Sequence, residues 1–203
     1  MPLLVKLNGF EVAHFGARMV SMGKPAFVAA ADHVTSDVAQ AAATAASAHA
    51  PSSPEASLAM ARAPCVVVYV PSRKQAQLTA IDFATYAAAG GDPLLFLGGA
   101  TQEAKEQVAK QLDAVMTSSE GHIADPALAS TLPKGVAFVH GGMSTEERQR
   151  VQGLAADGVA RVLVVPYGLA WQVQCRASMV VVMDTVSYDG REHRCVFKGV
   201  NPP

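Results

Sequence analysis

The stretch Cys65-Val-Val-Val-Tyr-Val-Pro-Ser-Arg73 decides the fold class of this chain. An apolar run rich in β-branched residues, with no polar interruption, indicates a strand that is buried on both faces. Pro71-Ser72 ends the strand, apolar residues at helical spacing follow over residues 73–89, and Gly90-Gly91 stops the helix. The stretch therefore predicts the strand and the helix of one α/β unit.

The same alternation continues toward the C-terminus. Further buried strands are predicted at residues 135–140, 161–165 and 179–184. A polar helix is predicted over residues 101–116, and another begins at Ser144-Thr-Glu-Glu147. That spacing is typical of a capping box, in which Ser144 accepts from the Glu147 amide and the Glu147 carboxylate reaches back to the Ser144 amide. Apolar strands that alternate with helices predict an α/β fold with a mainly parallel sheet flanked by helices on both faces. Ligands bind such sheets at the carboxyl ends of the strands.

The N-terminal third of the chain is less regular. Residues 3–10 alternate loosely and predict a strand, and residues 12–33 predict a helix that is interrupted near Pro25. Residues 36–63 contain twelve alanines, five serines and two prolines. We expect a mostly flexible insertion there, with a poorly packed surface helix as the alternative. The predicted organisation is a lead-in strand and helix (1–35), the insertion (36–63) and the main domain (64–203).

Composition excludes several classes of protein. Half of the 203 residues are hydrophobic and 16% are charged, which suits one folded domain, and the formal net charge of −1 gives no global attraction for nucleic acid. Any nucleic-acid contact must therefore be local. The three cysteines form no C-x-x-C pair, which favours buried thiols in a reducing compartment over a disulfide framework or a zinc site. With neither a membrane-length apolar run nor a secretory leader, we expect a soluble intracellular chain without a membrane partner.

The loops that follow the predicted strands resemble motifs of superfamily-2 RNA helicases. Residues 68–82 look like motif IV, and residues 140–148, His-Gly-Gly-Met-Ser-Thr-Glu-Glu-Arg, look like the signature after it. Leu169-Ala-Trp171 stands where motif V has Leu-Ala/Cys-Trp-Gly, and residues 180–185 match the strand that follows. The chain is most similar to the second RecA-like domain of the large spliceosomal helicases of the U5 small nuclear ribonucleoprotein. Of their two helicase cassettes, it is most like the C-terminal one. The resemblance implies a RecA-like three-layer sandwich.

The resemblance also implies a nucleic-acid interface, because the second domain of these helicases lies along the phosphate backbone of the translocated strand. Ser72, Arg73 and Lys74 would contact phosphate. The alternative is that Arg73 and Lys74 are simply solvated residues in the first turn of a helix. His140, Gly141 and Gly142 would present bare backbone amides to an anion near the start of a helix. The alternative is a structural turn with His140 packed underneath it.

The motif V region departs from the family pattern. The region comprises Gly168, Leu169, Ala170, Trp171, Gln172 and Gln174. The family has Ser or Thr at the positions of Pro166 and Gly168, and Gly and Asn at those of Gln172 and Gln174. These losses suggest poor coupling of ATP to RNA. Trp171 could stack on a base, but burial against the sheet is the favoured interpretation.

The resemblance sets the functional expectations. The sequence has no G-x-x-x-x-G-K-[ST] loop and no D-E-x-H-like motif, so the chain itself should hold no cofactor or metal and should be inactive alone. ATP and Mg²⁺ would belong to an upstream first RecA-like domain of the same parent, and the chain would stop just before motif VI.

The leading hypothesis is a fragment of a nuclear, ATP-dependent spliceosomal RNA helicase, which unwinds base-paired small nuclear RNA and has RNA and splicing proteins as partners. The alternative is a degenerate pseudo-helicase module that docks splicing proteins. An unrelated nucleotide-binding enzyme is disfavoured because no G-x-G-x-x-G follows a strand.

Overall fold

The computed structural model describes residues 4–47, 65–99, 101–117, 123–188 and 193–195. The helices are α1 (Phe15–Ser47), α3 (Arg73–Ala89), α4 (Gln102–Thr117), α5 (Pro126–Thr131) and α6 (Thr145–Ala156), with two 3₁₀ turns, η1 (Leu132–Lys134) and η2 (Tyr167–Gln172). The strands are β1 (Cys65–Val70), β2 (Val136–Phe138), β3 (Val162–Pro166), β4 (Ala177–Val182), β5 (Val186–Tyr188) and β6 (His193–Cys195).

Four strands form one parallel sheet in the order β2-β3-β1-β4, and β5 and β6 form a separate antiparallel pair. The central strands β1 and β3 are buried on both faces, whereas β4 at the edge alternates between exposed and half-buried side chains. The predicted α/β fold with a parallel sheet is confirmed, and the arrangement is that of a RecA-like sandwich. Because the strands are parallel, the loops after β1, β2 and β3 all leave from the same edge.

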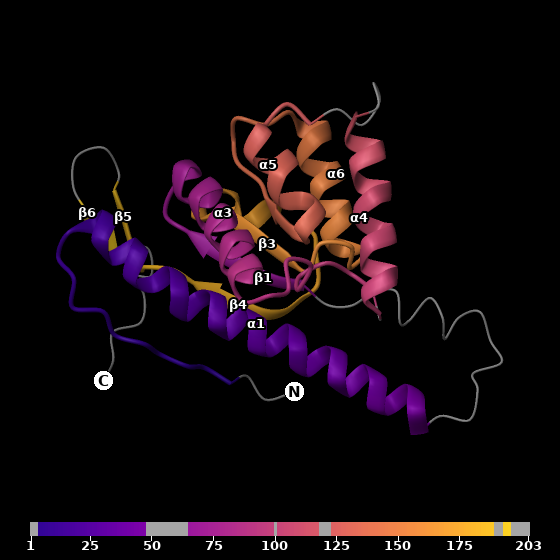
Figure 1. Cartoon of the computed structure of the whole chain (residues 1–203). Coiled ribbons are helices and arrows are strands. Elements are labelled where there is room, and N and C mark those ends of the chain that lie inside the picture. The colour runs from indigo at the N-terminus through magenta and orange to yellow at the C-terminus, as the bar shows by residue number, and fades with distance from the viewer. Residues whose placement is uncertain (1–3, 48–64, 100, 118–122, 189–192, 196–203) are drawn as a thin grey trace.

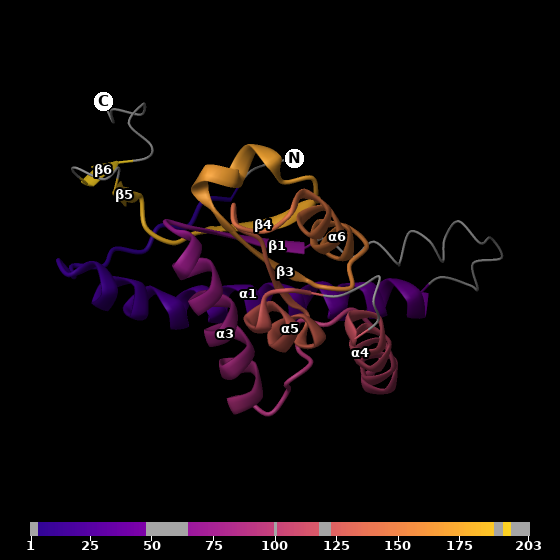
Figure 2. The same cartoon turned by 90° about the horizontal axis from the view of Figure 1, so that it is seen from above.

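Helices cover both faces of this sheet. Figure 2 shows α6 on one side and α1, α3, α4 and α5 on the other. In Figure 1 the long helix α1 runs past β4 and the lower end of α3. An aromatic contact anchors it there, because Phe27 of α1 meets Phe83 of α3 edge-on with ring centroids 5.7 Å apart. Such a pair contributes roughly 0.5–1.5 kcal/mol beyond its burial.

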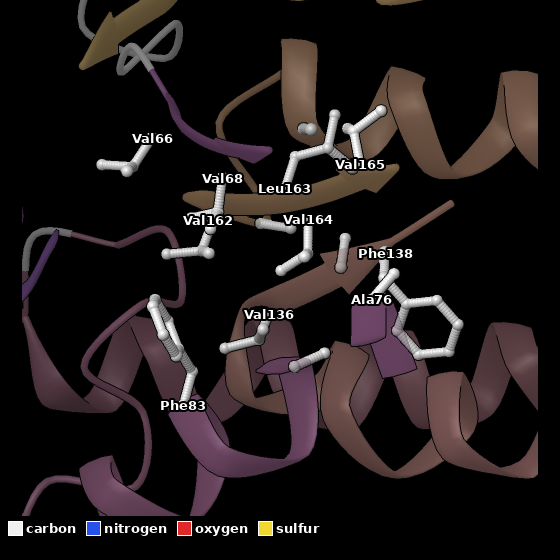
Figure 3. Close-up of a cluster of buried hydrophobic side chains, with 14 of the residues drawn as sticks. Val66, Val68, Ala76, Phe83, Val136, Phe138, Val162, Leu163, Val164 and Val165 are labelled. Carbon is white, nitrogen blue, oxygen red and sulfur yellow. The ribbon is translucent and has the colours of Figure 1, made fainter. Parts of the chain in front are cut away.

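The core lies between α3 and the sheet. Figure 3 shows Phe83 and Ala76 of α3 facing valines of the strands, with Phe138 alongside. The turn into β2 depends on Gly135, which has a φ of +80°. A Cβ at that position would collide with the backbone of Phe96, so only glycine allows this close approach.

The serine cap that the sequence predicts at Ser144 is present, and the structure shows a second one at Ser72. The Ser72 hydroxyl accepts a hydrogen bond from the Gln75 amide at 3.2 Å, and the Ser144 hydroxyl accepts one from the Glu147 amide at 3.1 Å. The second half of the predicted capping box is not formed. The Glu147 carboxylate instead accepts from the Ala124 amide at 3.3 Å, which ties the segment before α5 to α6.

The N-terminal predictions need correction. Residues 4–10 form no strand, and α1 continues through Pro25 without the predicted interruption. The helix persists because Met19, Ala26, Ala30 and Val34 are buried at helical spacing, so packing outweighs the hydrogen bond that proline removes.

The predicted flexible insertion is also wrong in its first part. Residues 36–47 continue α1, as in the helical alternative, because a packed helix nucleates its own extension and alanine has the highest helix propensity. The rest of the predicted insertion, residues 48–63, lies outside the described residues. The proposed boundaries between the three segments therefore stay predictions.

Candidate nucleic-acid interface

The loop after β1 places three polar residues at the carboxyl edge of the sheet. Ser72, Arg73 and Lys74 are exposed and form the entry of α3. The Ser72 oxygen is engaged as the helix cap, but its hydroxyl proton is still available to donate to a ligand. The predicted residues are thus placed on the surface, and the capping role of Ser72 does not exclude a phosphate contact.

The loops after β1 and β2 meet through Arg73 and Gly142. A Cβ built on Gly142 would lie 2.7 Å from the guanidinium carbon of Arg73. The Arg73 side chain therefore covers the Gly142 backbone, and no residue larger than glycine fits while Arg73 holds this position. The structure thus joins two segments that sequence reasoning had assigned to the same interface on separate grounds.

His140 is a structural residue of the loop after β2. Its side chain is almost fully buried and stacks on Phe138, with ring centroids 5.9 Å apart. Its Nδ1 accepts from the Gly142 amide at 3.1 Å, so its Nε2 carries the proton and donates to Asp125 at 3.2 Å. The structural-turn alternative is therefore the one that the geometry supports for His140. The expectation of a bare amide is wrong for His140, whose amide donates to Met143 Sδ at 3.4 Å, and for Gly142. Gly141 is exposed with open space around its Cα.

Asp125 supports this loop, and sequence reasoning missed it. Its Oδ1 accepts from the Ala127 amide at 2.9 Å, and its Oδ2 accepts from Gln77 at 2.6 Å as well as from His140. Burial raises the pKa of Asp125, but these hydrogen bonds outweigh burial, so the pKa is lowered below its usual range. The dipeptide Asp125-Pro126, an N-cap followed by proline at the first helical position, was the available signal.

Trp171 is exposed, which overturns the predicted burial against the sheet. Its relative exposure is 99%, and no residue of the short turn η2 is buried. Trp171 borders a hollow of about 420 Å³ between η2 and α6, which Arg148, Gln152 and Gln174 also line. The Gln174 amide donates to Gln152 Oε1 at 3.0 Å across this hollow. An exposed indole beside a guanidinium and amide groups suits either a base or a peptide.

The remaining residues of the motif V region are placed around this turn. Leu169 and Ala170 are half-buried, whereas Gly168 and Gln172 are exposed. A Cβ at Gly168 would meet no atom within 4 Å. A Ser or Thr side chain would therefore fit here without a clash with the described residues. The absence of the hydroxyl is a chemical difference from the helicase pattern and has no steric cause in this part of the chain.

The carboxyl end of β4 is closed by the protein itself. Arg18 of α1 forms an ion pair with the buried Asp184. The Tyr167 hydroxyl donates to the carbonyl oxygens of Met183, at 2.7 Å, and Asp184. Burial, followed by the negative charge of Asp184, raises the pKa of Tyr167. The segment after β4 thus makes internal contacts that fix α1 and η2.

Ser178, His33 and Asp37 lie close together among the described residues but do not have the geometry of a nucleophilic triad. His33 Nε2 lies 2.7 Å from Ser178 Oγ and 3.5 Å from Asp37 Oδ2, so the same ring nitrogen contacts both partners. A nucleophilic triad needs the carboxylate on the other ring nitrogen. Within the same part of the chain, no three acidic, histidine or cysteine side chains gather as metal ligands, and no helix has the length and apolarity to span a membrane.

Comparison with known proteins supports the helicase resemblance. The chain is 33% identical over 193 residues to the U5 small nuclear ribonucleoprotein 200 kDa helicase of Drosophila melanogaster, which covers 95% of the chain. The human helicase of the same name is 31% identical over 97% of the chain. Subunit 3 of the mouse activating signal cointegrator 1 complex is 30% identical over 97%. The chain spans about 7% of the length of each relative. Models of known protein families give no match. Nearly the whole chain is thus similar to one segment of these much longer proteins, and the resemblance to a helicase domain is confirmed.

Proposed function

We propose that this chain supplies the second RecA-like domain of an ATP-dependent RNA helicase and holds the phosphate backbone of an RNA strand at the carboxyl edge of its sheet. The observation that carries this proposal is the contact between Arg73 and Gly142, which brings two helicase-like motifs to one exposed place. The similarity to the U5 helicases over 95–97% of the chain supports it.

The chemistry of the Arg73 loop suits phosphate. The guanidinium of Arg73 offers bidentate, charge-assisted hydrogen bonds, Lys74 offers a point charge and Ser72 offers a hydroxyl donor. The proposed contacts are few, and the net charge of the chain is −1. Binding should therefore be weak, sensitive to salt and independent of base sequence.

The parent protein would carry the remaining parts of the machine. In this proposal ATP and Mg²⁺ bind an upstream first RecA-like domain, which is also the nearest partner of this chain. The parent acts in the nucleus, where it separates base-paired small nuclear RNAs during splicing. The name of the U5 relatives supports that setting.

A pseudo-helicase module that docks splicing proteins is the second candidate. The observation that favours it is Trp171, a fully exposed indole beside the hollow between η2 and α6, in a region that lacks the usual hydroxyls. Aromatic anchors of this kind are enriched at protein interfaces. In addition, the Gly142 amide already donates to His140 Nδ1, so one fewer backbone donor is available for phosphate.

Fluorescence anisotropy with labelled single-stranded RNA, at low and moderate salt, distinguishes the two candidates. For the RNA-binding domain we expect salt-sensitive binding that weakens several-fold in Arg73→Ala, because one charged phosphate contact is lost. Lys24→Ala is the matched control, since it removes an exposed charge of α1 and should bind RNA as the unmodified chain does. A folded chain that binds no RNA at tens of micromolar would favour the docking module.

A further inference from the structure

Two cysteine side chains meet at the amino-terminal edge of the sheet. Cys65 is the first residue of β1, and Cys175 lies in the link between η2 and β4. Their sulfur atoms are 3.2 Å apart. Cys65 is fully buried, whereas Cys175 is half-buried. They come from distant parts of the sequence, so their spacing gave no sign of this pair.

The backbone holds the two thiols side by side. The Cys65 amide donates to the Arg176 carbonyl at 3.1 Å, and Cys65 is paired with Ala177 in the ladder between β1 and β4. The register shifts immediately after Cys65, so the ladder is already irregular where the thiols lie. A disulfide bond is about 2.05 Å long, so its formation requires the sulfurs to approach by only about 1.2 Å.

We propose that Cys65 and Cys175 form a reversible dithiol–disulfide site whose oxidant is a small-molecule disulfide such as oxidised glutathione. The half-buried Cys175 is the thiol that an external disulfide reaches first. Cys65, fully buried and in contact with it, is the resolving thiol. In reducing compartments such disulfides, where they form, are usually transient and either catalytic or redox-sensing.

The reaction takes place in two exchanges. Cys175 releases its proton to solvent, and its thiolate attacks one sulfur of oxidised glutathione, whose S–S bond breaks and releases one glutathione thiolate. Cys65 then loses its proton and attacks the Cys175 sulfur, so that the second glutathione thiolate leaves. The two protein thiols are oxidised, and one glutathione disulfide is reduced to two thiols.

The acidity of the two thiols agrees with this order. The hydrogen bond that Cys65 donates lowers the pKa of Cys175 against the opposing effect of burial. The same hydrogen bond, together with burial, raises the pKa of Cys65. Thiolate is therefore more available at the accessible sulfur, where the first exchange occurs.

Oxidation would also affect the surface described above. Cys175 directly follows Gln174, which lines the hollow beside Trp171. A bond from Cys175 to Cys65 would fix the segment between η2 and β4 to the first residue of β1. We therefore expect the oxidised chain to unfold at a higher temperature than the reduced chain, because the crosslink restricts the unfolded state.

Thiol mapping of the 203-residue chain with Cys195→Ser tests the proposal, because only Cys65 and Cys175 then remain. Incubation of the native protein with oxidised glutathione should remove both free thiols. Mass spectrometry should find one crosslinked peptide pair, and reductant should restore both thiols. Cys65→Ala in this background should stop at a glutathione adduct on Cys175, and Cys175→Ser should leave Cys65 unmodified.

Two outcomes would overturn the proposal. One is a stable glutathione adduct on Cys175 with Cys65 still free, and the other is no reaction of a chain that is folded by circular dichroism. Peptide mapping of the unsubstituted chain gives the same readout if Cys195→Ser does not fold. Equal melting temperatures of the oxidised and reduced forms would contradict the predicted stabilisation of the fold by the crosslink.

Discussion

Arg18 and Asp184 form a two-pronged ion pair across 166 residues of sequence. Arg18 Nη2 and Nε lie 2.8 and 2.9 Å from Asp184 Oδ2, and the two side chains are only 15% and 5% exposed. Asp184 has a φ of +70°, and its other oxygen accepts from the amides of Thr185 and Val186. The pair attaches α1 to the end of β4, so the long N-terminal helix is an integral part of the domain.

Removal of one partner of this pair should destabilise the fold. In Arg18→Ala, Asp184 keeps a buried charge without its counter-ion, and we expect a loss of about 3 kcal/mol in the free energy of unfolding. Urea unfolding followed by circular dichroism measures it. Arg150→Ala, which removes an exposed arginine of α6, is the control and should change stability by less than about 0.5 kcal/mol. Equal effects of the two substitutions would show that the ion pair does not attach α1.

The support beneath the His140 loop should depend on pH. Because the pKa of Asp125 is lowered in the folded state, its contribution to stability is present above the ordinary aspartate pKa and is lost as the pH falls through the folded-state value. We expect Asp125→Asn to lose stability at pH 6 and to show a weaker decline below about pH 4 than the unmodified chain. Urea unfolding across this range measures both effects, and the exposed Asp157→Asn should keep the full decline.

The contact between Arg73 and Gly142 offers a matched pair of glycine substitutions. Gly142→Ala should displace the Arg73 guanidinium and weaken RNA binding several-fold. The guanidinium is the end of a flexible side chain, so the loss of stability should stay below about 1 kcal/mol. Gly141→Ala has open space for its methyl group and should leave both RNA binding and stability unchanged. RNA anisotropy that does not distinguish Gly142→Ala from Gly141→Ala would argue against Arg73 as a phosphate ligand in this position.

Gly168 tests whether the missing motif V hydroxyl limits RNA affinity. A side chain fits at this position without contact to other atoms, so Gly168→Ser restores a hydroxyl without disturbing the fold. For the RNA-binding domain we expect tighter binding in the anisotropy titration. Gly168→Ala adds a methyl group without the hydroxyl and should give no gain. No gain from either substitution would support the docking module.

Trp171 is the single tryptophan and therefore a direct optical probe of its surface. Because it is fully exposed, its fluorescence should resemble that of an indole in water and should be quenched readily by acrylamide. Trp171→Phe should change stability by less than about 0.5 kcal/mol, because no buried contact is lost. A blue-shifted emission that acrylamide does not reach would show that the side chain is buried in solution.

Local patterns predicted most of the fold. The apolar runs that became β1 and β3, and the serine that caps α6, were predictable because each depends on residues that are neighbours in sequence. The N-terminal segment was predicted less well. Neither Pro25 nor the alanine-rich run showed that contacts with α3 and β4 would hold one long helix together.

The sequence by itself determined the parallel α/β sheet, the order of its loops and the resemblance to helicase motifs, since hydrophobic periodicity and turn residues act over short distances. Only the tertiary structure decided what the side chains of those loops do. It buried His140 on Asp125, exposed Trp171 and brought Cys65 to Cys175. These pairings depend on which strands become neighbours in the sheet and which loops leave from the same edge. The packing of the whole core decides this, and no local run of residues encodes it.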